Sequence, residues 1–376
     1  MEFFPDFTSL TESFASIFFW SMAFTQLFWL IFFYARIAFH KEGTRYENFP
    51  ISVIIAARNE EDNLFENLPY LLEQDYPNFE VIVVNHQSVD GTKFILNAYQ
   101  KKYPHLSIIN IEKEKHLNYG KKLPLTIGIK GAKHEHLIMT DADCKPASDQ
   151  WIRIVAGKFS DKNKIVLGYA PYLKRQGLLN KTIRLDTTFI GLNYLSYAKA
   201  GLPYMGVGRN MAYTKSLFFE NKGFKSHYSI SSGDDDLFIQ EAIKKRNYTI
   251  TISPETFCYS APKETWKEWL KQKSRHFTTA PRYPLFKRLL LGIYPLTLLF
   301  FYISFVTLVV NTWLNWVSLI VLVLVLILKW VILGLSFKKL DQKEMISGIL
   351  LWDLFYAIFA PILYYTSEEL NGKTWK

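Results

Sequence analysis

Cysteine is scarce in this chain, which contains only Cys144 and Cys258. Two cysteines cannot build the disulfide framework of a small secreted domain, and they suit a reducing compartment. Residues 1–16 hold no lysine or arginine, so they lack the basic start of a cleaved secretory signal. A dinucleotide oxidoreductase is disfavoured as well, because Gly206-x-Gly208 has no third glycine and no such fingerprint follows the first predicted strand.

Long apolar runs, in contrast, occur four times, at residues 17–38, 289–310, 313–335 and 346–366. Each is long enough to cross the hydrocarbon core of a bilayer, which is about 30 Å thick. The first run is too long for a cleaved signal, so we expect a retained anchor. The predicted division is an N-terminal region with one transmembrane helix (1–40), a cytoplasmic domain (41–263), an amphipathic interfacial segment (264–285), and three transmembrane helices with a C-terminal tail (286–376).

Basic residues gather on one side of these runs, at Arg36, Lys41, Arg45, Lys287, Arg288, Lys338, Lys339 and Lys343. The positive-inside rule then predicts a multi-pass protein of the inner (plasma) membrane, with the large domain cytoplasmic and both termini outside. Attraction to anionic lipids explains the net charge of +10 better than nucleic acid does. Within the spans, we expect Lys329 to snorkel towards the cytoplasmic end and Asp353 to lie close to that end.

Between the first span and the second, strand and helix patterns alternate. Short apolar runs predict strands at residues 51–56, 79–84, 106–111 and 136–140, with helices at 59–72, to about 102, and at 122–132. This order predicts an α/β fold, an open parallel sheet with helices on both faces. Ligands of such sheets bind outside the carboxyl ends of the strands. Polar clusters fall at those ends, at residues 57–60, 85–86 and 141–143.

The later part of the domain is less regular. It predicts a strand near residues 165–170, a helix over 178–199, a glycine-bearing strand or turn over 206–213, and a helix that begins after the acidic run 234–236 and ends near 245. Residues 265–277 combine tryptophans with many basic residues, which is typical of an amphipathic helix at a membrane surface.

Asp141-Ala-Asp143 directly follows the apolar strand 136–140. Carboxylate oxygens are ligands for Mg²⁺ or Mn²⁺, which also bind the phosphates of a substrate. The tripeptide alone is a weak signal, because it also occurs on solvated loops. Its neighbours along the chain give it weight.

In order and spacing these elements resemble the family 2 glycosyltransferases, inverting enzymes with a GT-A fold, and especially membrane-embedded members such as cellulose, hyaluronan and glucosylceramide synthases. The matching segments are 52–60, 83–92, 120–122, 141–143, 208–210, 233–237 and 272–275. The resemblance covers about residues 50–280 and implies a Rossmann-like nucleotide-sugar-binding domain carried by four transmembrane helices.

The resemblance also implies roles for individual residues. Asp143, assisted by Asp141, would hold the Mg²⁺ or Mn²⁺ that neutralises a nucleoside-diphosphate leaving group. The catalytic base would be Asp234, with Asp235 as the alternative; a helix N-cap is the structural alternative for Asp234. The remaining implied contacts to donor or acceptor are Ala57, Asn59, Glu60, Asn85, Lys121, Lys122, Asp141, Arg209, Asn210, Gln272 and Arg275. Lys121 and Lys122 are interpreted equally well as solvated residues at a helix N-terminus. Arg209 and Asn210 are interpreted equally well as part of a glycine turn with a capping asparagine.

Two departures from the family pattern affect specificity. His276 stands where the Gln-x-x-Arg-Trp element has tryptophan, which weakens the case for processive polymerisation. Asn85 and His86 stand where the family usually has the aspartate that recognises the nucleotide base, so the base is left open, with a UDP-sugar favoured. For Lys271, Lys273 and Arg275, a basic helix lying on lipid is an alternative without catalysis.

The leading hypothesis is therefore an inverting glycosyltransferase that moves a sugar from a nucleotide-diphosphate sugar to a membrane-associated, lipid or glycan acceptor, in glycolipid or cell-surface polysaccharide synthesis. The alternatives are a processive polysaccharide synthase and a catalytically inactive, glycosyltransferase-like membrane scaffold. The pattern predicts membrane lipids as partners and no nucleic acid, and it does not indicate an oligomeric state.

Overall fold

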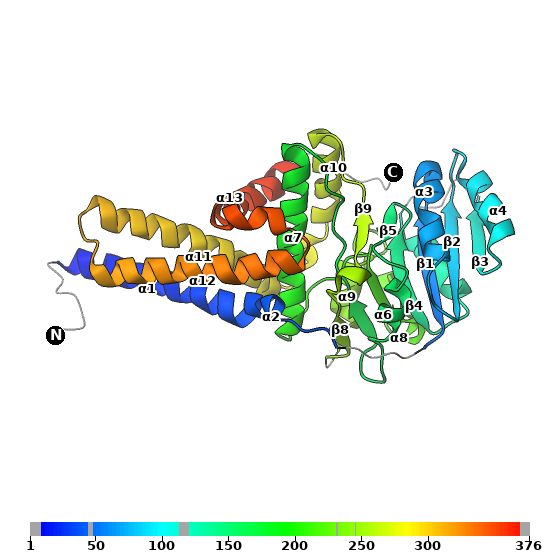
Figure 1. The fold of residues 1–376 in the computed structure, drawn as a ribbon, viewed down its shortest axis with the longest axis horizontal. Coiled ribbons are helices and arrows are strands. Elements are labelled where there is room, and N and C mark those ends of the chain that lie inside the picture. Colours follow the sequence, from blue (N-terminus) through cyan, green and yellow to red (C-terminus); the bar gives the residue numbers. More distant parts are fainter. Residues whose placement is uncertain (1–8, 44–47, 113–119, 231, 245, 369–376) are drawn as a thin grey trace.

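The computed structural model describes residues 9–43, 48–112, 120–230, 232–244 and 246–368. A bundle of long helices forms one end of the molecule, and a sheet domain forms the other (Figure 1). Four helical segments are long and apolar enough to cross a membrane: Leu10–Ala38, Leu285–Val310, Trp316–Lys339 and Lys343–Thr366. The four predicted spans are thus present as helices, each somewhat longer than, or shifted from, its apolar run.

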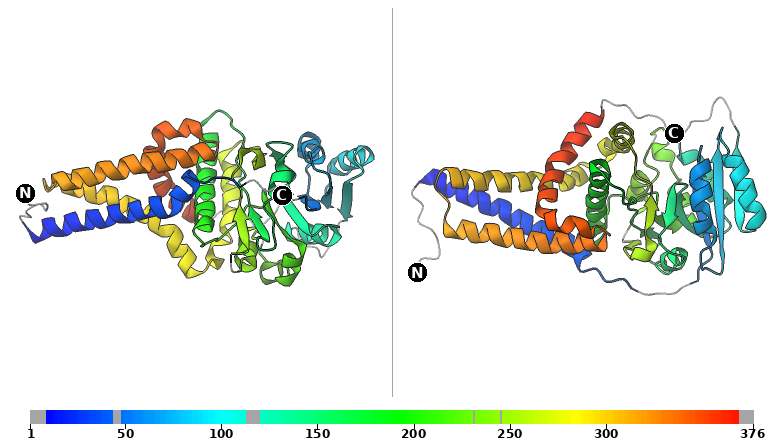
Figure 2. Two further views of the ribbon diagram at one scale, coloured as in Figure 1. Left: turned by 60° about the horizontal axis from the view of Figure 1, so that its bottom comes forward. Right: turned by 45° about the horizontal axis from the view of Figure 1, so that its top comes forward.

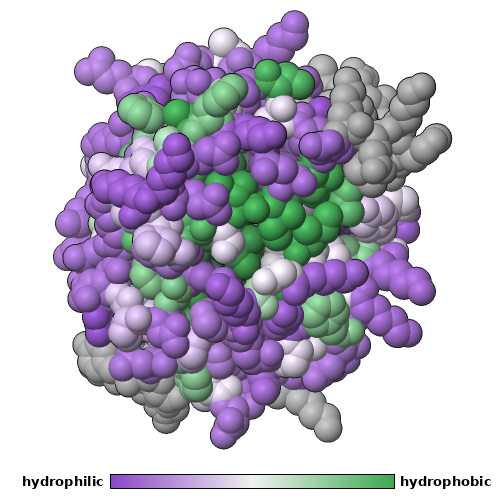
Figure 3. Space-filling view, turned by 90° about the vertical axis from the view of Figure 1, so that its right-hand side faces the viewer, coloured by the Kyte–Doolittle hydropathy of each residue, from purple (hydrophilic) through white to green (hydrophobic). Residues whose placement is uncertain are grey.

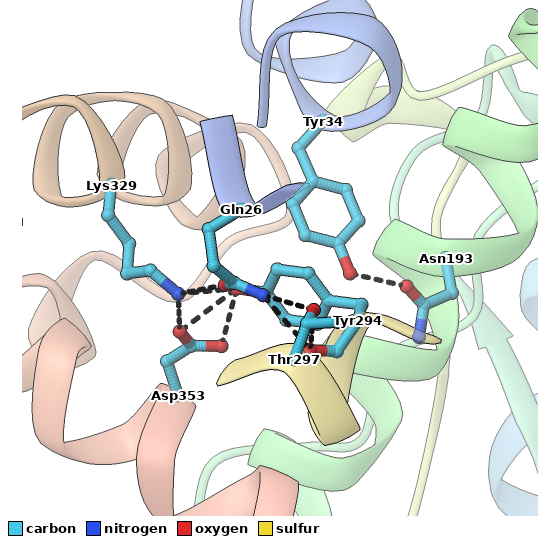
Figure 4. A network of polar contacts seen from close by, with 7 residues as sticks. All are labelled: Gln26, Tyr34, Asn193, Tyr294, Thr297, Lys329 and Asp353. Atoms are coloured by element: carbon cyan, nitrogen blue, oxygen red, sulfur yellow. Dashed lines mark hydrogen bonds and ion pairs between the residues drawn. The ribbon is translucent and has the colours of Figure 1, made fainter. Parts of the chain in front are cut away.

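The helix α13 (Ile349–Glu368) lies across the end of the bundle that faces the sheet domain (Figure 2). The bundle itself is built from α1 (Leu10–Trp29), which continues through a π-helical turn (Leu30–Tyr34) into α2 (Ala35–Ala38), and from α11 (Leu285–Val310) and α12 (Trp316–Lys339). Inside it, the prediction that Lys329 snorkels is wrong. The Lys329 side chain is fully buried, and its ammonium donates to Asp353 Oδ2 (2.5 Å), the Tyr294 hydroxyl (2.9 Å) and Gln26 Oε1 (3.0 Å) (Figure 4). The reason is that Asp353 faces it from the neighbouring helix, and a paired charge need not reach water.

This polar network joins all four membrane helices. Tyr294 on α11 donates from its hydroxyl to the Asp353 carboxylate of α13 at 2.9 Å. Gln26 on α1 donates to the backbone carbonyl of Tyr294 (3.1 Å) and to Thr297 Oγ1 (2.8 Å). All three ammonium hydrogens of Lys329 therefore have acceptors, and the bundle is held in one register at this level.

The sheet domain has seven strands in the order β3-β2-β1-β4-β7-β6-β8. They are β1 (Ile51–Ala57), β2 (Phe79–His86), β3 (Leu106–Ile111), β4 (His136–Asp141), β6 (Ile165–Leu167), β7 (Met211–Thr214) and β8 (Tyr248–Ile250). The predicted parallel order holds for β1 to β4. The sheet as a whole is mixed, because the chain enters β7 beside the carboxyl end of β4 and runs back antiparallel to it.

Helices cover both faces of the sheet, as predicted. Successive residues of β1 point to opposite faces. Val53 and Ile55 pack in one core with α3 (Glu61–Leu72), α4 (Thr92–Lys102) and α6 (Trp151–Ala156). Ile54 and Ala56 pack in the other core, with α5 (Lys122–Gly131) and α7 (Leu178–Lys199). The remaining elements of this domain are β5 (Cys144–Pro146), α8 (Lys215–Glu220), α9 (Asp236–Ala242) and β9 (Cys258–Ser260).

The helix α7 lies between the sheet and the bundle, across the ends of the membrane helices (Figures 1 and 2). Its Tyr197 hydroxyl accepts from the Trp29 indole at 3.0 Å, and its Asn193 Oδ1 accepts from the Tyr34 hydroxyl at 2.8 Å. The core on this face of the sheet continues without a break through α7 into α11, α12 and α13. The site is therefore built at a junction where the two parts share one apolar interior.

The opposite end of the molecule is mostly hydrophilic around one apolar area (Figure 3). On α3 and α4, at that end, Phe65 and Phe94 are exposed by 62% and 78%. Exposed apolar side chains are thus not confined to the membrane helices.

Candidate active site

The two carboxylates of the Asp-x-Asp tripeptide lie at the carboxyl end of β4. Asp141 is the last residue of that buried strand, and Asp143 precedes β5. Both line a cavity of about 840 Å³. Burial opposes ionisation of Asp141, but the Lys121 ammonium, and to a smaller extent Arg209 and Arg275, outweigh it and lower the pKa of this carboxyl. Asp141 therefore stays ionised, as a cation ligand must be.

Lys121 bridges the two acidic groups of the site. Its ammonium lies 2.5 Å from Asp141 Oδ1 and 3.4 Å from Asp234 Oδ2. Burial alone would lower the pKa of Lys121, but the surrounding carboxylates raise it above its ordinary value. Lys121 is not the solvated helix-end residue of the alternative interpretation, because its side chain is only 14% exposed and lines the cavity.

Lys122, its neighbour, faces away from the cavity. It is buried, and its ammonium donates to the backbone carbonyls of His227 (2.5 Å), Ile230 (2.9 Å) and Ser232 (2.7 Å). These carbonyls belong to the segment that leads to Asp234. The structure thus places Lys122 in support of the acidic run, without a contact to the space where a substrate would lie.

The acidic run begins α9 beside the Asp-x-Asp tripeptide. Asp235, not Asp234, is the N-cap of α9: its Oδ1 accepts from the Asp236 N–H (2.8 Å), and its Oδ2 accepts from the Gly208 N–H (3.0 Å). Burial, together with the nearby charges of Asp234 and Asp236, raises the pKa of Asp235 to about 7. The N-cap alternative for Asp234 is wrong, because the helix starts one residue later than that interpretation required.

The third acid, Asp236, was not singled out as a site residue from sequence. It is buried, and its Oδ2 accepts from the Thr279 hydroxyl (2.5 Å) and the Tyr283 hydroxyl (2.6 Å). It therefore joins α9 to the segment between α10 (Trp266–Phe277) and α11. Nothing in the local sequence marks it, because its partners lie more than forty residues away.

Arg209, in the loop before β7, and two residues of α10, Gln272 and Arg275, complete the polar wall. Arg209 donates to Ser260 Oγ and to the Ala170 carbonyl, each at 2.8 Å, and its guanidinium lies 4.3 Å from the centre of the Tyr172 ring. Gln272 donates to the Tyr172 hydroxyl at 3.2 Å. Arg275 lines the same cavity. Tyr172 is thus a shared support that sequence analysis did not identify.

The helix α10 is held by a buried ion pair. Lys273 donates to Asp186 of α7 at 2.8 Å, and both side chains are about 6% exposed. The alternative of a basic helix lying on lipid therefore fails for Lys273, because its charge points inward to α7. Asp186 was missed from sequence, since a single acid in a long helix gives no signal of a partner far along the chain.

Of the remaining predicted contacts, only Glu60 lines the cavity. Ala57 is buried at the end of β1, and Asn59 joins two strand ends, since its N–H donates to Ser88 Oγ and its Oδ1 accepts from the Val89 N–H, both at 2.9 Å. Asn210 donates to the Tyr169 and Thr256 carbonyls and accepts from the Trp151 indole, so its polar groups serve the fold.

Asn85 lies outside the cavity, at the carboxyl end of β2. Its Nδ2 donates to Asn110 Oδ1 of β3 at 2.9 Å, whereas its own Oδ1 is buried without a hydrogen-bond partner. A buried amide oxygen without a partner is uncommon in native structures. Because Asn85 does not line the cavity, the structure does not bring this oxygen to the space beside the acidic groups.

The donor set suits a hard divalent cation. Asp141 and Asp143 offer carboxylate oxygens on the cavity wall, and Mg²⁺ or Mn²⁺ at such sites is held by one or two carboxylates plus substrate phosphates. Among the described residues there is no cluster of three or more histidine, cysteine, aspartate or glutamate side chains that could hold a metal alone. The residues present fit a cation that arrives with a phosphorylated ligand.

Comparison with known proteins agrees with this geometry. Residues 52–219 match the model of glycosyl transferase family 2, and residues 145–335, just over half of the chain, match that of glycosyl transferase family group 2. The structure is similar to that of the mannosyltransferase PcManGT from Pyrobaculum calidifontis, solved in complex with GDP-Man and Mn²⁺, with a TM-score of 0.54 over 92% of this chain and 99% of that chain. At 18% identity this similarity shows a shared fold.

Two relatives illustrate the similarity in sequence. The chain is 26% identical over 234 residues to the probable glycosyltransferase YdaM of Bacillus subtilis, which is 60% of this chain and 54% of the relative. It is 25% identical over 227 residues to a poly-beta-1,6-N-acetyl-D-glucosamine synthase of Staphylococcus epidermidis, 60% of this chain and 53% of the relative. The chain thus matches about half the length of each. On the family match, this chain belongs to the family 2 glycosyltransferases.

Proposed function

We propose that the protein transfers a sugar, with inversion, from a nucleoside-diphosphate sugar to a hydroxyl group of a membrane lipid. The observation that carries this proposal is the continuity of the cavity. Asp141, Asp143 and Asp234 line it together with residues of α11 and α13, two helices that are long and apolar enough to cross a membrane. A lipid acceptor could therefore reach the acids without leaving the bilayer.

The residue roles follow from position. Asp141 and Asp143 would hold Mg²⁺ or Mn²⁺, which supplies a Lewis acid for the departing diphosphate. Arg275 adds a guanidinium to the same cavity and can bind phosphate oxygens in pairs. The contact of Asn85 with the nucleotide base, with a UDP-sugar favoured, rests on the resemblance to the family alone, because its carboxamide oxygen is buried and Asn85 does not line the cavity.

Asp234 is our choice for the base. Both oxygens of Asp235 accept from backbone N–H groups, which orient that carboxylate as a helix cap. Asp234 instead meets the Lys121 ammonium on the cavity wall. A base must lie within hydrogen-bond reach of the hydroxyl that it deprotonates, and the place of Asp234 on the cavity wall beside the Asp-x-Asp tripeptide supports this role.

We place the sheet domain on the cytoplasmic side of the inner membrane, where nucleotide sugars are found. A polysaccharide synthase is the second candidate, favoured by the similarity to a poly-beta-1,6-N-acetyl-D-glucosamine synthase. The length of the product distinguishes the two, because single transfer gives one added sugar and processive synthesis gives a ladder.

The experiment uses the full-length protein in nanodiscs with a panel of UDP- and GDP-sugars, with Mn²⁺, Mg²⁺ or EDTA. Release of nucleoside diphosphate and label in the lipid phase are measured for the parent, Asp143→Ala and Asp234→Asn. Asp161→Asn, an exposed carboxylate outside the cavity, is the matched control. We expect EDTA and both site variants to abolish transfer and the control to keep it. A parent that turns over no donor refutes the proposal, and site variants with undiminished rates refute the assignments.

A further inference from the structure

The cavity continues beyond the acidic groups into the helix bundle. Most of its lining there comes from α11 and α13, with Tyr34 beside Tyr294; the residues include Gly292, Tyr294 and Pro295 of α11 and Tyr356, Ala357 and Ala360 of α13. Most of these side chains are apolar or aromatic. Nothing in the chemistry of nucleotide-sugar binding requires such an extension, so it calls for a ligand of its own.

One end of this extension is closed. Tyr294 of α11 donates to Asp353 of α13, and Lys329 binds both from behind (Figure 4). These contacts join the two helices tightly at that level, and both Tyr294 and Asp353 are buried. A ligand cannot pass between the helices there without breaking the buried hydrogen bond from Tyr294 to Asp353.

On the active-site side of this contact, the two helices present small residues to the cavity. A Cβ atom added to Gly292 would have no neighbour within 4 Å, and Ala357 and Ala360 face the cavity from α13. Gly292 is exposed, and Tyr365, further along α13, is 70% exposed although it also lines the cavity. The cavity wall is thus also part of the outer surface of the bundle.

The other border of this opening is the helix α10. Trp269 stacks on Phe359 with ring centres 6.0 Å apart, and Phe277 meets Tyr364 at 5.2 Å. These contacts hold α10 along α13. Because Lys273 anchors α10 to α7 through Asp186, the frame of the opening is fixed by packed elements.

We propose that the gap between α11 and α13, bounded by Gly292, Pro295, Ala357 and Ala360, is a lateral portal through which the hydrocarbon chain of a lipid acceptor reaches the catalytic cavity. This inference rests on the proposed function and adds the route of the acceptor to it. The occupant is an apolar chain, because the lining is apolar and the two helices would face lipid. Arg288, on the first turn of α11, lies at the cavity edge, where it can contact a polar headgroup.

Two variants narrow the portal, Gly292→Trp and Ala360→Trp. The matched control is Ile320→Trp, which adds the same side chain to an outward position of α12 that is 55% exposed and outside the cavity. Each full-length protein is placed in nanodiscs of phosphatidylethanolamine, phosphatidylglycerol and dioleoylglycerol. Sugar label in the lipid phase is measured in these nanodiscs. Release of nucleoside diphosphate without a lipid acceptor is measured in a second set of nanodiscs that lacks dioleoylglycerol.

We expect label in the lipid phase to fall by a factor on the order of ten or more in both portal variants, because an indole fills the space that a chain needs. Release of nucleoside diphosphate to water should stay at the parent rate, since the acidic groups are untouched. Lipid labelling at the parent rate in both portal variants, or equal losses in Ile320→Trp, would overturn the portal.

A second readout does not depend on activity. A diacylglycerol with a diazirine in one acyl chain is crosslinked in the same nanodiscs, and the labelled residues are located by mass spectrometry. The portal predicts label on Leu291 and Tyr356, reduced in Gly292→Trp; label only on outward residues such as Leu319 and Ile320 contradicts it. Crosslinks in the portal of a parent that glycosylates only soluble acceptors would support the portal and refute the proposed function.

Discussion

Replacing Lys122 by methionine tests how the acidic run is held. Methionine has similar length and bulk, but it removes the ammonium that donates to the carbonyls of His227, Ile230 and Ser232. Hydrogen bonds to a charged group contribute about 1.5–3 kcal/mol each, so three contribute about 4.5–9 kcal/mol. Burial lowers the pKa of Lys122 from 10.5 to about 8, and this desolvation offsets about 3 kcal/mol of that gain.

The net loss expected for Lys122→Met is therefore about 1.5–6 kcal/mol, confined first to the segment that leads into α9. Amide hydrogen exchange of residues 236–242 should accelerate by roughly tenfold to ten-thousandfold, and sugar transfer should fall because Asp234 is no longer held. The control is Lys133→Met: this ammonium is 73% exposed, lies 3.7 Å from Glu80, and should contribute almost nothing. Exchange in α9 equal to that of the parent would refute the reasoning.

Three further predictions concern the same region. The pKa of Asp235 in the folded protein is raised above its unfolded value to about 7, so the folded state loses stability as Asp235 ionises with rising pH. The melting temperature should therefore fall between about pH 4 and 7, and it should fall less in Asp235→Asn. An equal dependence of melting temperature on pH in the parent and in Asp235→Asn would contradict this. Lys273→Met and Asp186→Asn should each destabilise by about 3–5 kcal/mol, and the double variant by less, because the single changes leave a buried charge unpaired; additive losses would count against the pair. Gly208→Ala should fold normally, since an added Cβ lies 3.5 Å from its nearest neighbours, but it should transfer sugar more slowly because the methyl group enters the site; an unchanged rate would show that no ligand approaches there.

Patterns of neighbouring residues in the sequence predict the positions of individual helices and strands. The helix over residues 178–199 is observed with those bounds as α7, and the predicted strand over residues 106–111 as β3. Asp141 falls at the end of β4 as expected, because the chain leaves the buried interior of the sheet where an apolar strand gives way to a carboxylate. These features depend on neighbours within a few residues, which a single sequence contains.

Contacts between distant residues were not predictable in the same way. Nothing near Lys329 indicates that Asp353 will face it, so snorkelling was the reasonable but wrong expectation. Lys122 and Lys121 are adjacent and chemically identical, yet one supports a backbone segment and the other lines the cavity. The direction of a side chain at the start of a helix is decided by packing against elements far along the chain, and composition does not reveal it.

The shared apolar interior has a practical consequence for anyone who wishes to study this enzyme in water. Leu185 and Phe189 of α7 belong to the same core as Leu333 of α12 and Ile54 of the sheet. A fragment cut free of the long apolar helices would uncover those side chains and remove one wall of the cavity. The sheet domain and these helices are thus a single folded body, and we expect neither half to stay folded alone in solution.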